Sequence, residues 1–154
     1  MAQKVLYMHG FASAGNNGTV THLRNMLYEH GISLTAPDIP AEPKEAMAML
    51  TALVSELQPD LIIGTSMGAF YAEQMTGYQR ILVNPSFHMA RLLTFRGMGR
   101  QEYRNKREDG AKDFKVDKEM IAQFKEIEKQ SFQHITAEEK EKVWGLFGLQ
   151  DKNV

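Results

Sequence analysis

The stretch LIIGTSMGAF, residues 61–70, places one serine between two glycines directly after a short apolar run. The run LII is typical of a buried strand, and MGAFYAEQMTGY, which begins at Met67, is typical of a helix. Residues 64–68 therefore match G-x-S-x-G, a sharp turn from a strand into a helix. A Cβ two residues before or after Ser66 would meet neighbouring backbone, which explains both glycines. The alternative is a tight turn with a chance serine, but the flanking strand and helix favour the motif.

Four further strands are expected on either side of this turn. Their sequences are KVLYM (4–8), ISLTA (32–36), RILVNP (80–85) and VWGLFG (143–148). Apolar residues at helical spacing predict helices over 20–31 and in the segment that ends before Pro59. Strands that are apolar on both sides and alternate with helices favour a parallel sheet covered on both faces. We therefore predict an α/β fold, a doubly wound and mostly parallel sheet of about five strands.

Residues 88–142 interrupt this alternation. They hold 13 of the 18 Lys and Arg residues and 11 of the 19 Asp and Glu residues. Met120, Phe124 and Ile127 form an apolar stripe within this charged segment, as expected for solvated helices with a few anchors. We predict that residues 1–154 form a single domain in which residues 88–142 are a charged helical insertion, at the position where many α/β enzymes carry a lid.

The composition excludes several classes of protein. The chain has 154 residues, a formal net charge of -1 and no cysteine. It therefore offers no long-range field for nucleic acid or an anionic membrane, no disulfide and no thiolate metal site. It lacks the glycine-rich nucleotide motifs and the H-E-x-x-H zinc motif, so we expect no cofactor and no metal. No signal peptide or 18-residue apolar run is present, which favours a cytoplasmic location and no membrane partner.

Three elements point to acyl-transfer chemistry at the carboxyl edge of the predicted sheet. The turn around Ser66 exposes Oγ as a nucleophile. The strand in YMHGF ends in His-Gly, so the backbone N–H of Phe11, together with that of Met67, is predicted to face the developing oxyanion. Asp151, three residues after Gly148, is placed to orient a histidine. A solvated aspartate in a turn is the alternative at that position.

The segments YMHGF, PDIP, GTSMGAF, LVNPS and GLFGLQD together resemble the small YqiA-type esterases of the α/β-hydrolase superfamily. The resemblance implies hydrolysis of small-molecule carboxylic esters or acyl thioesters by a Ser-Asp-His triad, without a cofactor. Ser66 would be the nucleophile and Asp151 the acid, and the N–H groups of Phe11 and Met67 would form the oxyanion hole. A non-catalytic protein that binds an acyl ligand or a partner through the same cleft is the alternative.

The sequence departs from this family at the histidine. In the family it follows the acid, beyond a further helix and strand, whereas this chain has histidines at 9, 22, 30, 88 and 134. A histidine in a turn, such as His9, is more often structural than catalytic. His88 and His134 lie in or beside the insertion, and the sequence does not fix their distances from Ser66. We therefore expect an incomplete domain that lacks the C-terminal strand and helix. VWGLFG would then be an exposed edge strand, which favours a homo-oligomer.

Overall fold

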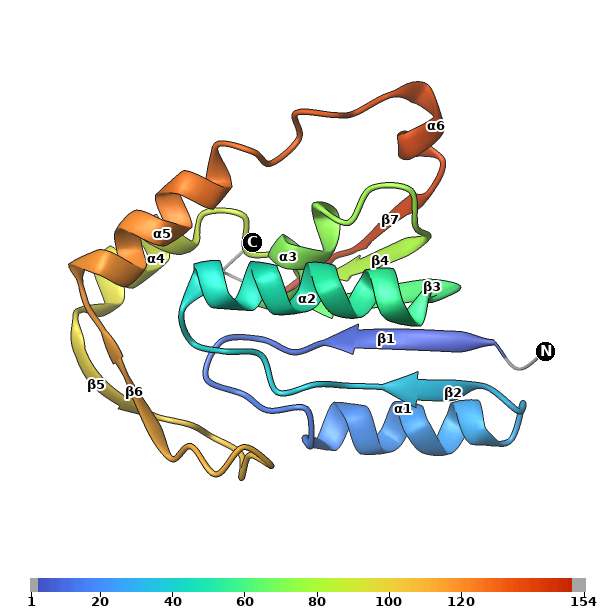
Figure 1. Cartoon of the computed structure of the whole chain (residues 1–154), viewed down its shortest axis with the longest axis horizontal. Coiled ribbons are helices and arrows are strands. Elements are labelled where there is room, and N and C mark those ends of the chain that lie inside the picture. The colour runs from blue at the N-terminus through green and yellow to red at the C-terminus, as the bar shows by residue number, and fades with distance from the viewer. Residues whose placement is uncertain (1–2, 151–154) are drawn as a thin grey trace.

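A computed structural model describes residues 3–150 of the chain and contains a five-stranded parallel sheet (Figure 1). The strand order is β2-β1-β3-β4-β7. The strands are β1 (Lys4–Met8), β2 (Ser33–Thr35), β3 (Leu61–Thr65), β4 (Arg80–Val83) and β7 (Val143–Leu146). Each of the five strands expected from the sequence is present, and every pairing between them is parallel. The predicted parallel sheet of about five strands is therefore confirmed.

Three helices connect the strands of this sheet: α1 (Gly18–Tyr28), α2 (Pro43–Leu57) and α3 (Met67–Glu73). Asn17 caps α1, because its side chain accepts a hydrogen bond from the Val20 N–H at 3.0 Å. Right-handed crossovers place α1 on one face of the sheet, and α2 and α3 on the other. The sheet is therefore doubly wound, as expected.

Residues 88–142, expected as a helical insertion, contain three helices and one additional element. The helices are α4 (Met89–Arg96), α5 (Lys118–Glu128) and α6 (Ala137–Lys140). The additional element is an antiparallel hairpin of β5 (Gly99–Glu102) and β6 (Asp113–Val116), which the sequence reading did not predict. Figure 1 shows α4, α5 and this hairpin beyond the carboxyl ends of the central strands.

The insertion also contributes to the main hydrophobic core. Met120, Phe124 and Ile127 of α5 are buried, as the apolar stripe in the sequence indicated. The ring of Phe124 lies 6.0 Å from that of Phe70 in α3. Because α5 packs on the helices that cover the sheet, removing the insertion would expose part of the central core.

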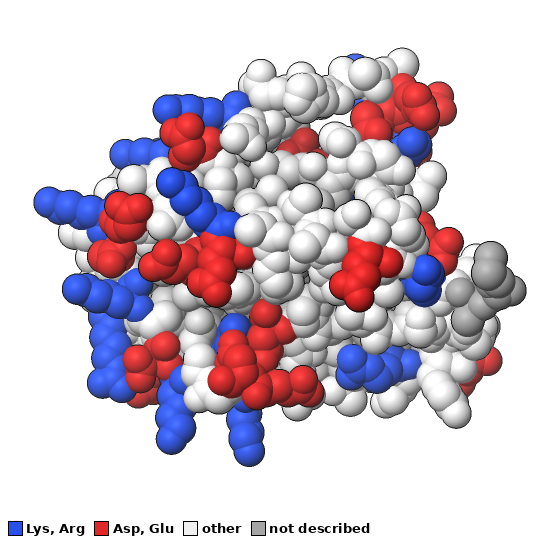
Figure 2. All heavy atoms as spheres, viewed as in Figure 1, with Lys and Arg blue, Asp and Glu red and all other residues white. Residues whose placement is uncertain are grey.

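The surface of the insertion carries charges of both signs. Figure 2 shows Lys and Arg side chains gathered over this end of the molecule, with Asp and Glu side chains among them. At one edge of the sheet, β7 pairs only with β4 within residues 3–150, and Trp144 and Leu146 are about half exposed. None of the helices in this range is long and apolar enough to cross a bilayer.

Candidate functional site

Ser66 occupies a strained turn between β3 and α3. Its backbone has φ 55° and ψ -114°, a combination that side-chain-bearing residues rarely adopt. Hydrogen bonds hold this conformation: the Ser66 N–H donates to the Val83 carbonyl at 3.0 Å, and the Ser66 carbonyl accepts from the Ser86 N–H at 3.1 Å. The surrounding structure therefore fixes Ser66 in a conformation that the isolated chain would avoid.

The glycines around Ser66 are required by close backbone approach. A Cβ on Gly64 would lie 2.5 Å from the Gly68 carbonyl oxygen, and a Cβ on Gly68 would lie 1.9 Å from the Met8 carbonyl oxygen. Both neighbours are backbone atoms, which cannot turn away as a flexible side chain could. Gly10 is a milder case, because its Cβ would lie 3.5 Å from Cβ of Ser66, an ordinary contact distance. This last distance also shows that the turn after β1 lies directly beside Ser66.

Ser66 lines a cavity of about 520 Å³ at the carboxyl edge of the sheet. The walls come from the ends of β1, β3 and β4, from the loop that leads into α1, and from the insertion. Residues that line it include Tyr7, Gly10, Phe11, Ser13, Asn17, Thr65, Asn84, Ser86, Leu92, Arg96, Arg104 and Asn105. Aromatic and aliphatic side chains thus share the cavity with two arginines, a mixture that suits a small organic molecule with a polar or anionic group.

The structure shows the surroundings of the two residues that the sequence suggested as oxyanion donors, Phe11 and Met67. Phe11 belongs to a turn closed by the hydrogen bond from the Ser13 N–H to the Gly10 carbonyl, 3.2 Å long, and it lines the Ser66 cavity. Met67 follows Ser66 as the first residue of α3, so its N–H has no partner inside the helix. Within residues 3–150, neither N–H donates to a protein acceptor outside regular structure. Their donation to an oxyanion at Ser66 stays a prediction.

The sequence reading missed two residues beside Ser66, both in the segment LVNPS after β4. The Ser66 hydroxyl donates to Oγ of Ser86 at 3.4 Å, a long hydrogen bond that holds the hydroxyl only loosely. Oδ1 of Asn84 accepts a hydrogen bond from the Gly148 N–H at 2.6 Å and so fixes the turn that follows β7. Both residues belong to the segment LVNPS, which is one of the segments that resemble the YqiA-type family. The sequence alone assigned no function to either residue.

His9 is a structural residue in this fold. Its Nε2 accepts a hydrogen bond from the Ile39 N–H at 2.9 Å, and Nδ1, which therefore carries the proton, donates to the Gly10 carbonyl at 2.8 Å. Burial lowers the pKa of the ring, which is consistent with a neutral imidazole. Because both ring nitrogens have backbone partners, His9 is not free to accept a proton from Ser66.

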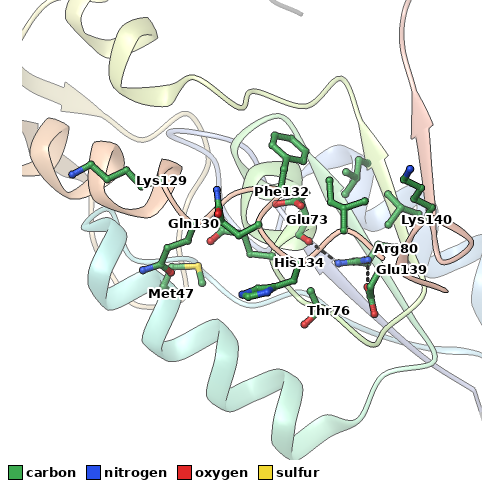
Figure 3. Close-up of a pocket in the computed structure, with 15 residues that line it drawn as sticks. Met47, Glu73, Thr76, Arg80, Lys129, Gln130, Phe132, His134, Glu139 and Lys140 are labelled. Carbon is green, nitrogen blue, oxygen red and sulfur yellow. Dashed lines mark hydrogen bonds and ion pairs between the residues drawn. The ribbon is translucent and has the colours of Figure 1, made fainter. Parts of the chain in front are cut away.

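The other histidines lie outside the Ser66 cavity. His22 and His30 are exposed on and after α1, and His88 is exposed before α4. His134 lines a second cavity of about 560 Å³, which has no lining residue in common with the first (Figure 3). In the part of the chain that the structure describes, no imidazole therefore lines the Ser66 cavity. Asp151, the expected acid, lies outside the described residues.

The second cavity is built around a buried ion pair. Arg80 of β4 donates to the Glu139 carboxylate and to the Glu73 carbonyl, each at 2.6 Å. Figure 3 shows Arg80 between these two residues. Burial raises the pKa of the nearby Glu73 carboxyl, against the opposing effects of a backbone N–H from Phe132 and the charge of Arg80. This arrangement anchors α6 to the sheet before β7. Across residues 3–150, no group of three or more potential metal ligands occurs.

A comparison with models of known protein families assigns this chain to a family. A family model described as "Uncharacterised protein family (UPF0227)" matches residues 4–153. The chain belongs to this family. The match confirms the resemblance to the small YqiA-type proteins that the sequence segments indicated.

Two solved structures have a fold similar to that of this chain. A monoacylglycerol lipase from Paleococcus ferrophilus superposes with a TM-score of 0.57 at 18% identity, covering 94% of this chain and 72% of the lipase. A putative hydrolase from Agrobacterium vitis S4 superposes with a TM-score of 0.58 at 11% identity, covering 82% of this chain and 61% of that protein. The UPF0227 chain therefore has the α/β-hydrolase fold that both structures share.

Proposed function

We propose that this protein is a serine hydrolase that cleaves carboxylic esters or acyl thioesters through an acyl-enzyme on Ser66. The observation that carries the proposal is the conformation of Ser66, strained at φ 55° and ψ -114° and held beside a cavity of about 520 Å³. Strained residues of this kind concentrate at active sites, where the surrounding structure maintains the strain. In the proposed reaction, Oγ attacks the acyl carbonyl, the alcohol or thiol leaves, and water then releases the acid.

Each of the other site residues has a role in this proposal. The N–H groups of Phe11 and Met67 donate to the oxyanion that forms when Oγ attacks. By analogy with the YqiA-type esterases, Asp151 would orient the histidine that acts as the general base. No histidine among residues 3–150 is assigned to that role. Leu92 and Phe11 offer apolar contacts to the substrate, whereas Arg96 and Arg104 favour a polar or anionic group on it.

A second candidate is a non-catalytic protein that binds an acyl ligand in the same cavity. The observation that favours it is that no imidazole lines the cavity within residues 3–150. An α/β-hydrolase that lacks one triad member still accelerates hydrolysis by about 10³–10⁴-fold over water, through its oxyanion hole and substrate binding. The two candidates therefore differ in whether turnover depends on Ser66, even when turnover is slow.

The test is hydrolysis of p-nitrophenyl butyrate and of a butyryl thioester by the wild type, by Ser66→Ala and by Ser55→Ala. Ser55 is an exposed serine on α2 and provides a matched control. We expect the wild type and Ser55→Ala to hydrolyse at least one substrate at the same rate, and Ser66→Ala to hydrolyse it much more slowly, keeping only the acceleration that the oxyanion hole and substrate binding supply. Equal rates for the wild type and Ser66→Ala would favour the non-catalytic candidate.

A further inference from the structure

Arg107 is a buried arginine in the loop between β5 and β6, outside the Ser66 cavity. Its side chain is 1% exposed, and all three of its nitrogens make hydrogen bonds. Nη1 donates to the Ser13 carbonyl and Nη2 to the Ile39 carbonyl, each at 3.0 Å. Nε and Nη2 also hold the Asp109 carboxylate, and the guanidinium lies 4.2 Å above the ring of Tyr103.

The two carbonyls held by Arg107 belong to the segments that fix the turn beside Ser66. Ser13 closes the Gly10–Ser13 turn that carries Phe11. Ile39 donates its N–H to His9, the residue immediately before that turn. Arg107 therefore holds one end of the turn directly and the other end through a single neighbour.

Further bonds join the same loop of the insertion to this turn. The Arg104 N–H donates to the Ala12 carbonyl at 2.8 Å, and the Ser13 hydroxyl donates to Oδ1 of Asn105 at 3.2 Å. Ala12 has φ 61°, a conformation that residues with a side chain rarely adopt without support. The turn beside Ser66 is thus held in a strained shape by contacts from a segment more than 90 residues away in sequence.

An arginine at this position does more than fill space. A buried ion pair is weak evidence for stability, because apolar residues of similar volume often stabilise the fold equally well. Only a fork of N–H donors can hold two carbonyls and a carboxylate in fixed relative positions. The partners of Arg107 therefore favour a role in fixing the position of the turn.

We propose that Arg107 is a positioning residue for acyl transfer, which holds the Gly10–Ser13 turn so that the Phe11 N–H faces the oxyanion formed at Ser66. This inference rests on the function proposed above. An oxyanion donor acts at about 2.7–3.1 Å from the oxygen. A displacement of about 1 Å is enough to lower the rate by about 10²-fold.

The experiment compares Arg107→Gln and Arg107→Lys with Arg100→Gln. Arg100 and Asp113 form an exposed arginine–aspartate pair in the same hairpin, so Arg100→Gln is a matched control. Each variant is checked for folding by circular dichroism, and kcat and KM are measured with p-nitrophenyl butyrate. We expect Arg107→Gln to lower kcat by about 10–100-fold with less than about a threefold change in KM. Arg107→Lys should recover part of the loss, and Arg100→Gln should stay within about twofold of the wild type.

Hydrogen exchange gives a second readout that does not depend on activity. In Arg107→Gln, we expect faster exchange at the amide of Ser13, which is bonded to the Gly10 carbonyl, and at that of Arg104, which is bonded to the Ala12 carbonyl, with exchange in β3 unchanged. Where Arg107→Gln does not fold, Asp109→Asn weakens the same cluster from its exposed end and should produce smaller changes in the same direction.

Two outcomes would overturn the inference. The first is a folded Arg107→Gln with the kcat of the wild type, and the second is a loss of kcat that matches only the fraction of unfolded protein. A wild type with no Ser66-dependent turnover would instead overturn the proposed function, and the catalytic role of Arg107 with it. Hydrogen exchange then decides separately whether Arg107 holds the turn.

Discussion

Replacing Ser66 by glycine should stabilise the protein relative to replacing it by alanine. Both variants lose the hydroxyl and its 3.4 Å hydrogen bond to Ser86, so that contribution cancels in the comparison. A residue with a side chain at φ 55° and ψ -114° carries about 1–3 kcal/mol of backbone strain, which glycine does not. Glycine in turn loses about 0.5–1 kcal/mol more conformational freedom on folding. The net expectation is that Ser66→Gly is more stable than Ser66→Ala by up to about 2.5 kcal/mol.

Urea unfolding at 25 °C, followed by circular dichroism, measures this difference. For a chain of this size, each 1 kcal/mol corresponds to about 2–4 °C in Tm, so thermal unfolding gives an independent check. Ser55, exposed in the regular helix α2, is the matched position. There the sign should reverse, with the glycine variant less stable than the alanine variant by about 1 kcal/mol. A Ser66→Gly variant that is less stable than Ser66→Ala would refute the assignment of strain to Ser66.

Three further predictions follow from the fold and the site. Gly68→Ala should destabilise the protein by more than about 4 kcal/mol, because its Cβ would meet the backbone of β1. Gly18→Ala has open space around the new Cβ and should change the free energy of unfolding by less than about 1 kcal/mol. Urea unfolding of both variants measures this difference, and equal stabilities would contradict it. Because burial lowers the pKa of His9, the unfolded state binds the proton more readily, so stability should fall as pH drops below about 6.5, by at most about 1.4 kcal/mol per pH unit. The slope between pH 7.5 and 5.5 should be shallower in His9→Gln, and an unchanged slope would count against a buried neutral ring. Finally, the exposed strand β7 should promote self-association that Leu146→Lys reduces, as measured by light scattering over a range of concentrations, and a monomeric wild type at all concentrations would argue against it.

The central sheet could be predicted from the sequence because its signals are local. Each strand is a short apolar run bounded by glycine, proline or polar residues, and the helices between the strands have their own apolar stripes. The placement of Ser66, Gly10 and Phe11 side by side also follows from sequence, since the carboxyl ends of neighbouring parallel strands meet at one edge.

The hairpin in the insertion could not be predicted in this way. Its strands, GRQE and DFKV, are mostly polar, and only Phe114 and Val116 pack against the core. What holds its loop in place is Arg107, whose partners Ser13 and Ile39 lie far away in sequence. Single-sequence patterns report local periodicity and carry no information on such pairings.

The same limit explains which site residues were missed. Ser86 reaches Ser66 only because β3 and β4 are neighbours, and its own sequence context is a loop after a strand. His9, in contrast, could be interpreted from the sequence, because its position in a turn indicated a structural role. The hydrogen bond from the Ile39 N–H to its ring shows how it holds the neighbouring segment.

The most direct test of the central claim is covalent labelling of Ser66 with a fluorophosphonate. The intact mass of the wild type should increase by a single adduct, and tandem mass spectrometry should map that adduct to Ser66. Ser66→Ala should acquire none under the same conditions, while Ser55→Ala should label like the wild type. A folded wild type that acquires no adduct, or an adduct that persists in Ser66→Ala, would contradict the assignment of Ser66 as an activated nucleophile.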